Sequence, residues 1–455
     1  MNKEDLYKSM DGISDEILNR SEQNMLPAPN IRKIKRKYLT IAASIAVVII
    51  IGAVLIISGS RKIKASNLME GIEAEKDIYG ASGDIYAKTI TDFSVQLFKE
   101  CYVNGENLLI SPVSVMASLG MCTNGAEGET LRQMEQVLGV DRDTLNKCIL
   151  GYMSNLAQSE KSKLSMANSI WFKDGLKGVN NGFLQTNANY YGAEIYQRKF
   201  DEDAKNEINK WVDDKTDGMI KKIQEEDIPE ETVMYLINAL SFDAEWEKIY
   251  QSHSVREGIF TTETGTEKQV TFMHSTEGLY LEDEDTTGFI KYYKGRDYAF
   301  VALLPKENIR MADYVDTLSE KKIGNLMDTG SNGMVFAKLP KFSYDYTIEL
   351  NKALKTMGMS DAFDFSKADL SGIASGDEGN IYISKVLHKT FISVDEKGTK
   401  AGAVTAISTN SGAAPDYHEV YLDRPFVYLL VDCKSNTPFF IGIVSDIGES
   451  MSDSN

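Results

Sequence analysis

Residues 396–406 read Glu-Lys-Gly-Thr-Lys-Ala-Gly-Ala-Val-Thr-Ala, and they follow a β-patterned stretch at 390–395. Threonine, valine and alanine suit a pleated strand, while Gly398 and Gly402 permit the backbone to bend. The polar stretch that comes next contains almost no large side chain. We therefore predict a segment that lies in a loop in one state of the protein and joins a sheet as an extra strand in another.

The order of side chains decides whether this segment can enter a sheet, because neighbouring residues of a strand face opposite ways. If Thr399 faces the interior, the inward positions that follow it are all small: Ala401, Ala403 and Thr405. Lys400 then faces water and keeps its charge hydrated. A charge at position 399 would instead be desolvated, at a cost of several kcal/mol. The pattern therefore predicts a segment that can insert.

Length and composition limit the possible classes of protein. The chain has 455 residues and is 42% hydrophobic, which is enough for a sizeable core. Its formal net charge of −18 opposes binding to nucleic acid. Four cysteines match neither a zinc site nor a redox CxxC pair, and we interpret them as buried thiols: Cys101, Cys122, Cys148 and Cys433. We expect no metal and no other cofactor.

Motifs of known catalytic centres are missing from the sequence. Its four histidines belong to no HExxH motif: His253, His274, His388 and His418. A P-loop and a GxSxG nucleophile elbow are also missing. We therefore expect that the chain is not an enzyme.

One segment near the amino terminus is long and apolar enough to cross a membrane. About twenty residues from Tyr38 to Ile57 carry no charge. A long polar stretch precedes them and no convincing small-residue cleavage site follows, so we expect a retained helix rather than a signal peptide, with secretion after cleavage as the alternative. Five basic residues lie within 32–37 and three within 61–64, which favours a cytoplasmic amino terminus. The remainder would then lie outside the cell, at the cell membrane.

These features divide the chain into a cytoplasmic tail at 1–37, a transmembrane helix at 38–58, a linker or stalk at 59–85 and a folded domain at 86–449. Amphipathic spacing predicts helices at 89–103 and 205–223, and Ser111-Pro112 opens another. Strand patterns come later, at 233–242, 298–304, 334–339, 426–431 and 439–444. Helices first and strands later, without regular alternation, indicate an α+β domain.

Several motifs of the folded part stand together in one order. They are Asn107-Leu-Leu-Ile-Ser-Pro-Val-Ser-Val, Gly125-Ala-Glu-Gly-Glu-Thr, Asn238-Ala-Leu-Ser-Phe with Trp246, Leu339-Pro-Lys-Phe, Met357-Gly-Met-Ser-Asp-Ala-Phe, Ala368-Asp-Leu-Ser-Gly-Ile, His388-Lys, the segment from Glu396, Asp423-Arg-Pro-Phe and Pro438-Phe-Phe-Ile-Gly. In this order and spacing the sequence resembles the serpin family over about residues 86–447.

The resemblance implies the serpin fold. That fold has a large, mainly antiparallel central sheet of five strands, smaller sheets, about eight to nine helices and an exposed reactive-centre loop, here at about 396–420. It also implies a mechanism in which a serine protease cleaves the loop and becomes trapped as an acyl-enzyme while the loop inserts into the sheet.

Matching the family motifs residue by residue gives three groups of site residues. The hinge of the loop consists of Glu396, Gly398, Thr399, Ala401 and Ala403. The region where the sheet opens consists of Ser111, Ser114, Asn238, Trp246 and His388. The scissile bond falls at Gly412–Ala413, with Asn410, Ser411 and Ala414 as neighbouring candidates because loop length varies.

The loop sequence limits the class of target protease. No lysine or arginine occurs from Ala401 to Asp423, so a trypsin-like enzyme has nothing to bind in its specificity pocket. Small residues around the bond suit an elastase-like or subtilisin-like protease, and a cysteine protease is a further candidate. Tyr417 would suit a chymotrypsin-like enzyme. The alternative is a non-inhibitory serpin that binds a ligand or partner. In either case we expect a monomer that binds no nucleic acid.

Overall fold

A computed structural model of the chain describes residues 65–80, 84–156, 162–374, 380–399 and 417–448. These residues all belong to one folded unit, Lys64–Asn455. The predicted transmembrane segment and the predicted scissile bond lie outside the described residues. Within the described residues, no helix combines the length and the apolar character needed to cross a bilayer.

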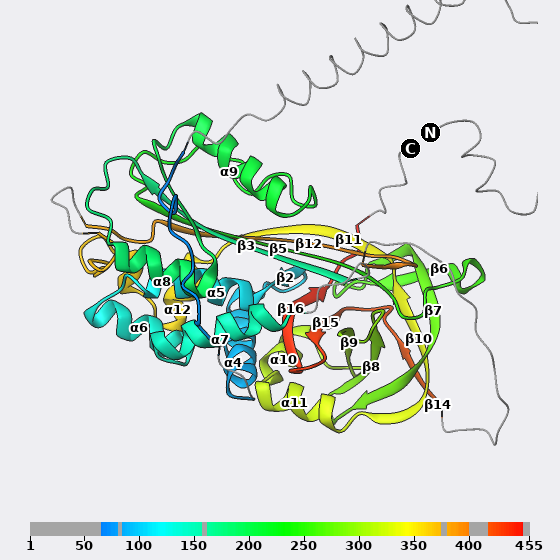
Figure 1. Cartoon of the computed structure of the whole chain (residues 1–455). Coiled ribbons are helices and arrows are strands. Elements are labelled where there is room, and N and C mark those ends of the chain that lie inside the picture. Colours follow the sequence, from blue (N-terminus) through cyan, green and yellow to red (C-terminus); the bar gives the residue numbers. More distant parts are fainter. Residues whose placement is uncertain (1–64, 81–83, 157–161, 375–379, 400–416, 449–455) are drawn as a thin grey trace, which may run out of the picture. The chain divides into compact units, whose positions relative to one another are not determined.

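The first of two sheets carries the site (Figure 1). Its five main strands match the predicted central sheet in number, and in spatial order they are β4 (Glu194–Arg198), β3 (Ser162–Lys173), β5 (Met234–Glu245), β12 (Lys385–Val394) and β11 (Phe342–Glu349). Two of their four pairings are parallel, so the sheet is mixed and not mainly antiparallel. Strands β3 and β5 are antiparallel, whereas β5 and β12 are parallel. Two short strands extend this sheet: β1 (Ser66–Asn67) on β4 and β13 (Gly398–Thr399) on β5.

The second sheet has nine strands in the part of the chain that is described. Eight follow one another in the order β14 (Tyr417–Tyr421), β10 (Ser331–Pro340), β7 (Glu267–Glu282), β8 (Thr286–Tyr292), β9 (Tyr298–Pro305), β15 (Phe426–Asp432), β16 (Thr437–Val444) and β2 (Leu108–Ile110). The ninth, β6 (Val255–Thr261), pairs with β7. Strand β7 pairs with β6, β8 and β10, so it joins into one sheet what the resemblance describes as separate smaller sheets.

Nine α-helices occur within the described ranges. They are α4 (Asp84–Cys101), α5 (Pro112–Thr123), α6 (Gly128–Leu138), α7 (Arg142–Asn155), α8 (Asn181–Tyr191), α9 (Glu202–Lys215), α10 (Met311–Thr317), α11 (Glu320–Asp328) and α12 (Asn351–Met357). The 3-10 turns η1 (Ser252–Ser254) and η2 (Asp361–Phe363) complete the inventory. Side-chain caps begin several helices; for example, Asp141 accepts the Thr144 N–H at 3.0 Å ahead of α7.

Helix α9 is shorter than its sequence pattern predicts. It ends at Lys215 instead of residue 223. Beyond it, Asp217 and Gly218 both adopt positive φ angles, which a helix does not tolerate. The Thr216 hydroxyl accepts the Ile220 N–H at 3.0 Å and stabilises this turn. The apolar spacing continues past the helix because Ile220 and Ile223 are still buried.

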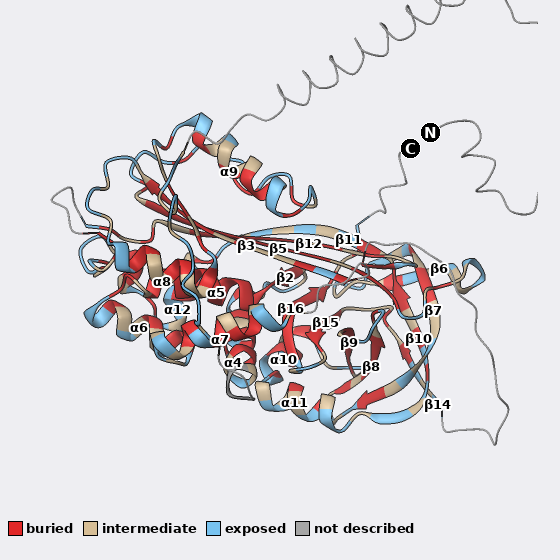
Figure 2. Ribbon diagram, viewed as in Figure 1, coloured by how far each residue is buried: buried red, intermediate tan, exposed pale blue. Residues whose placement is uncertain are grey.

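Helices cover both faces of the first sheet (Figure 1). Helix α9 contacts β3 from one side, and α5 contacts β3 and β5 from the other. Every residue of α5 is buried, so this helix has no solvated stripe and lies in the core of the unit. Buried residues fill the space between the sheets and the helices (Figure 2).

The predicted stalk at 59–85 differs from the structure. Ser66 and Asn67 pair with Gln197 and Tyr196 of β4, and the Leu68 N–H donates to the Ile195 carbonyl at 2.8 Å. Leu68, Met69 and Ile72 are partly buried against the core. Residues 65–80 are therefore part of the folded unit, although they precede the boundary predicted at residue 86.

Candidate functional site: the loop hinge and the region where the sheet opens

Three polar residues form a row across the middle of the first sheet. Asn168 of β3 and His388 of β12 both lie directly opposite Asn238 of β5. The Asn238 side-chain N–H groups donate to Asn168 Oδ1 and to Ser114 Oγ of α5. Its Oδ1 accepts from His388 Nδ1. One asparagine thus connects three strands and the helix beneath them.

Hydrogen bonds fix the protonation state of His388, which is fully buried. Its Nε2 accepts the backbone N–H of Ser111 at 2.9 Å, so this nitrogen carries no proton. The proton lies on Nδ1, where Asn238 Oδ1 accepts it. Burial lowers the pKa of His388 to about 3. The ring therefore stays neutral and connects strands β12 and β5 to the start of α5.

Strands β5 and β12 pair only along the first part of β5, from Tyr235 to Leu240, which lies opposite Thr390. Beyond that point the edge of β5 is occupied by the hinge, where Thr399 pairs with Ala244 and Gly398 with Glu245, antiparallel. The short strand also contacts β12. Two residues of the predicted loop thus already pair with the carboxy-terminal end of β5.

The residues around Trp246 hold the backbone just before this strand. The Trp246 backbone N–H donates to the Lys397 carbonyl at 2.8 Å, and its indole N–H donates to the Asp395 carbonyl at 2.9 Å. The Tyr250 N–H donates to the Glu396 carbonyl at 2.8 Å. Carbonyls of three successive residues are therefore satisfied by two residues that follow β5 in the chain, which fixes the direction of the hinge.

Thr399 points into the protein and is 1% exposed. Its hydroxyl hydrogen bonds with the Tyr293 hydroxyl at 2.8 Å. Tyr293 stacks on Trp246, with ring centroids 4.3 Å apart, so its position is fixed. Next to it, a Cβ on Gly398 would lie 2.0 Å from the Ala244 carbonyl oxygen. Only glycine permits this close approach of the hinge to β5.

Charged groups surround the hinge. Glu396 forms an ion pair with Lys341 at 2.9 Å; burial raises the pKa of Glu396, but the hydrogen bond from Lys341 and nearby positive charges outweigh burial and lower it. Lys291 lies over the rings of Trp246 and Tyr250, 4.3 Å from the Tyr250 ring centroid. It forms an ion pair with Glu277 at 2.8 Å. Both partners of this second pair are nearly excluded from water. Removing either one would leave a buried charge unpaired.

The structure brings together all described residues that the family motifs assign to the two regions. Ser111, Ser114, Asn238 and His388 form the central row with its helix contacts, and Trp246 contacts the hinge. The side-chain hydroxyl of Ser111 has no hydrogen-bond partner, so its backbone N–H makes the contact with His388. Ala401, Ala403 and residues 410–414 lie outside the described residues.

Sequence reasoning missed four contributors: Asn168, Tyr293, Lys291 and Glu277. None belongs to a motif that resembles the family, and Asn168 and Tyr293 act through partners far away along the chain. Tyr293, for example, is 106 residues from Thr399. Lys341 occurs in the Leu339-Pro-Lys-Phe motif, but its pairing with Glu396 has no local signal.

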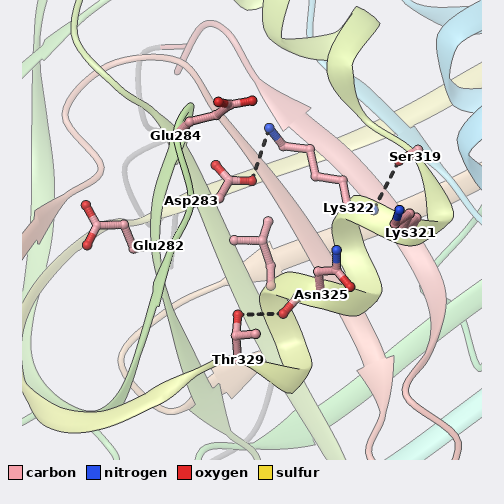
Figure 3. A pocket seen from close by; sticks show the side chains of 9 residues that line it. Glu282, Asp283, Glu284, Ser319, Lys321, Lys322, Asn325 and Thr329 are labelled. Carbon is pink, nitrogen blue, oxygen red and sulfur yellow. Dashed lines mark hydrogen bonds and ion pairs between the residues drawn. The ribbon is translucent and has the colours of Figure 1, made fainter.

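A hollow of about 400 Å³ lies against α11 (Figure 3). Its lining is largely charged or polar, and Leu326 is its one apolar side chain. Lys322 pairs with Asp283 at 3.2 Å and with Asp285 at 2.8 Å, so these charges satisfy one another. Small-molecule pockets are mostly apolar with a few converging polar groups. This hollow lacks that character.

The family of the chain follows from comparison with known proteins. The family model described as "Serpin (serine protease inhibitor)" matches residues 88–447. The chain belongs to the serpin family.

Individual serpins are similar to this chain over most of its length. Serpin B10 of Bos taurus is 30% identical over 393 residues, which cover 79% of this chain and 98% of that protein. Neuroserpin of Homo sapiens is 27% identical over 375 residues, with 78% of this chain and 90% of that protein covered.

Among solved structures, the thermophilic serpin tengpin in its native state has a TM-score of 0.81 and 46% identity, covering 85% of this chain and 100% of that chain. Tengpin in its latent state gives a lower TM-score of 0.73 at 47% identity, covering 81% of this chain. The described structure is thus more similar to the native form. Human thyroxine-binding globulin, solved in complex with its hormone, has a TM-score of 0.73 at 25% identity over 80% of this chain and 99% of that chain.

Proposed function

We propose that this serpin inhibits a serine protease by inserting its cleaved reactive-centre loop between β5 and β12. The observation that carries the proposal is the position of Gly398 and Thr399, which already form an antiparallel strand on β5 and contact β12. The inserting segment would only have to extend this short strand, because the direction and register of the strand on β5 are already set.

The register of the short strand specifies the inserted state. Extending it residue by residue places Ala401 opposite Phe242, Ala403 opposite Leu240 and Thr405 opposite Asn238. From Thr399 to Thr405 every inward side chain is small, and Ile407 is the first large one. At Thr405 the strand reaches the row of Asn168, Asn238 and His388, where the bonds that join β5 to β12, including the one from His388 to Asn238, must break. The threonine hydroxyl can replace one of them.

Energy and length suit this proposal. About fifteen residues at about 3.3 Å each give a strand of roughly 50 Å, which carries an attached protease from one pole of the domain to the other. New backbone hydrogen bonds at about 0.5–1.5 kcal/mol each sum to a driving force on the order of 10 kcal/mol. This supports the interpretation that the chain folds first to a metastable state.

The loop sequence supports an elastase-like or subtilisin-like target, with cleavage at Gly412–Ala413. A panel of such proteases should therefore yield a complex that survives denaturing electrophoresis. Mass spectrometry of the released fragment would set the register of cleavage, including the neighbouring candidates Asn410, Ser411 and Ala414.

Thr399→Arg tests the mechanism directly. Thr399 is already buried against Tyr293 in the described structure, so an arginine there would either bury its charge or keep the hinge off β5. In both cases the inserting strand loses its starting point, and we expect trapping to be lost while loop cleavage continues. The melting temperature of the wild-type protein should rise after cleavage, and that of cleaved Thr399→Arg should not. Lys397→Arg places the same side chain at an exposed hinge position and should still trap. Trapping by Thr399→Arg would contradict the insertion mechanism.

A non-inhibitory binding protein is the competing function, and thyroxine-binding globulin shows that the fold accommodates a ligand. The charged hollow against α11 gives this alternative little support in the described part of the chain. Simple cleavage of the loop by every protease in the panel, with no stable complex, would favour it.

We further propose that residues 38–58 anchor the chain in the cell membrane, with residues 1–37 in the cytoplasm and the serpin domain outside the cell. The uncharged run from Tyr38 to Ile57 and the excess of basic residues before it support this orientation. Because Ser66 already pairs with β4, the proposed linker shortens to residues 59–64.

A further inference from the structure

Exposed apolar side chains gather at the outer end of the second sheet. Met334 and Phe336 of β10 are 36% and 39% exposed, and Tyr417 of β14 is 63% exposed. Met334 pairs directly with Tyr417, so their side chains share one face, and the rings of Phe336 and Tyr417 lie 5.7 Å apart. We call these three residues the β10–β14 patch.

The patch is held in place by the opposite face of the same strands. His418 of β14 stacks on Tyr280 of β7, with ring centroids 3.8 Å apart, and Val420 is buried. Val335 and Ala337 of β10 are buried beside them. Alternate residues of both strands thus fix the backbone and leave the β10–β14 patch facing solvent.

The position of the β10–β14 patch along the chain identifies what can cover it. The proposed scissile bond ends at Ala413, and the described structure resumes at Tyr417, so a fully extended chain separates them by at most about 14 Å. A protease domain of about 220 residues has a radius of gyration of about 17 Å. An enzyme that holds Gly412–Ala413 in its active site therefore lies against this end of the sheet.

Size and charge argue against a second copy of this chain as the occupant. The three side chains expose on the order of 300 Å², which is far below the about 800 Å² that each partner contributes to a stable interface. Two copies would also each carry a formal net charge of −18 and repel one another. As a supplement to contacts made by the loop, however, this area is sufficient.

We propose that the β10–β14 patch is a docking surface for the target protease, which contacts it with an apolar rim on the side of its cleft that binds residues after the scissile bond. The proposal rests on the proposed function, since it assumes a protease that attacks the loop. It assigns part of the specificity to residues outside the loop.

The test uses substitutions on β10, so that the loop sequence stays unchanged. Phe336→Thr and the double variant Met334→Thr/Phe336→Thr keep a residue that favours strands while removing the apolar surface. Phe365→Thr is the matched control, because Phe365 is 58% exposed and follows η2, which packs against α6 at the opposite end of the unit from β14 (Figure 1). Equal melting temperatures would show that all variants fold.

The rate constant for attack on the loop, measured with the protease that cleaves it, should fall at least tenfold in the double variant and remain unchanged in Phe365→Thr. A synthetic peptide of residues 400–416 should be cut by that protease at a rate that defines attack without docking. The number of inhibitor molecules consumed per trapped protease should stay the same, because docking precedes insertion.

Unchanged attack in the double variant, or an equal loss in Phe365→Thr, would overturn the proposal. Sedimentation of the wild type as a dimer and of the double variant as a monomer would assign the patch to self-association instead. Loop cleavage without trapping would refute the inhibitory function, yet the cleavage rates would still decide whether the patch docks the protease.

Discussion

His388 shows how one residue can couple the central sheet to pH. Its Nε2 accepts a backbone N–H and its Nδ1 donates to Asn238, so both ring nitrogens are used by the neutral form. A second proton would remove the acceptor for Ser111 and place a charge among buried groups. The neutral ring is thus required by the geometry.

The stability of the fold should consequently depend on the protonation of this histidine. The pKa of His388 is about 3 when folded and about 6.5 in the unfolded chain, so between these values only the unfolded state binds the proton. The contribution of the neutral ring is fully present above pH 6.5 and is lost as the pH falls toward 3. We expect the urea midpoint of the wild type to fall over this range.

Substitution isolates that contribution from those of the carboxylates. The wild type should lose up to about 1.4 kcal/mol per pH unit more than His388→Gln between pH 6 and pH 4. His253→Gln, which removes an exposed imidazole, serves as the control. Parallel pH profiles for the wild type and His388→Gln would show that the buried ring does not take part.

At the scale of elements, the short strand β1 closes an edge of the first sheet. An exposed edge of β4 would offer unpaired backbone groups to other chains, and β1 covers part of it with hydrogen bonds. Further contacts hold the segment that follows: the Glu75 N–H donates to the Asn189 side chain at 2.9 Å, and the Gln185 side chain donates to the Glu73 carbonyl at 2.8 Å. The segment is held by apolar packing as well as by polar contacts.

Ile72→Asp should therefore destabilise the folded unit, because it places a charge where an isoleucine packs against the core. A loss of about 1–3 kcal/mol is expected in the free energy of unfolding. Ala74→Asp introduces the same side chain at an exposed position of the same segment and should have little effect. Faster amide exchange in β4 of Ile72→Asp would locate the change, whereas equal stability of the two variants would show that the segment contributes nothing.

At the scale of the whole molecule, the two sheets have different proposed roles. In the proposed mechanism the first sheet receives the loop, whereas the second contains β14, which follows the loop in the chain. Strands β5, β12 and β14 anchor the ends of the undescribed loop segment. The proposed membrane anchor adds the place of action to this arrangement.

The membrane proposal predicts a difference between the full chain and a chain that begins at residue 64. The full chain should sediment with membranes and resist extraction at high pH, and added protease should cut its loop on intact cells. The shorter chain should remain in the supernatant and trap protease equally well. Release of the full chain by alkaline washing would contradict an integral helix, and a loop protected on intact cells would contradict the proposed orientation.

Much of the fold was predictable because the relevant signals are local. Apolar spacing indicated α4, the Ser-Pro pair marked the start of α5, and continuous apolar runs indicated β5, β9, β15 and β16. The family motifs then implied the arrangement of these elements. The helix predicted to reach residue 223 was wrong at its end, since burial of Ile220 and Ile223 continues the pattern after the backbone has turned.

The sequence by itself determined the composition of the hinge, with small residues at every position that must be buried. Only the tertiary structure decided that Gly398 and Thr399 already lie on β5, that His388 is neutral, and that Phe336 and Tyr417 share one exposed face. These features depend on partners such as Ser111 and His388, which are 277 residues apart. Local propensity carries no information about such pairs, because their meeting depends on how the whole chain packs.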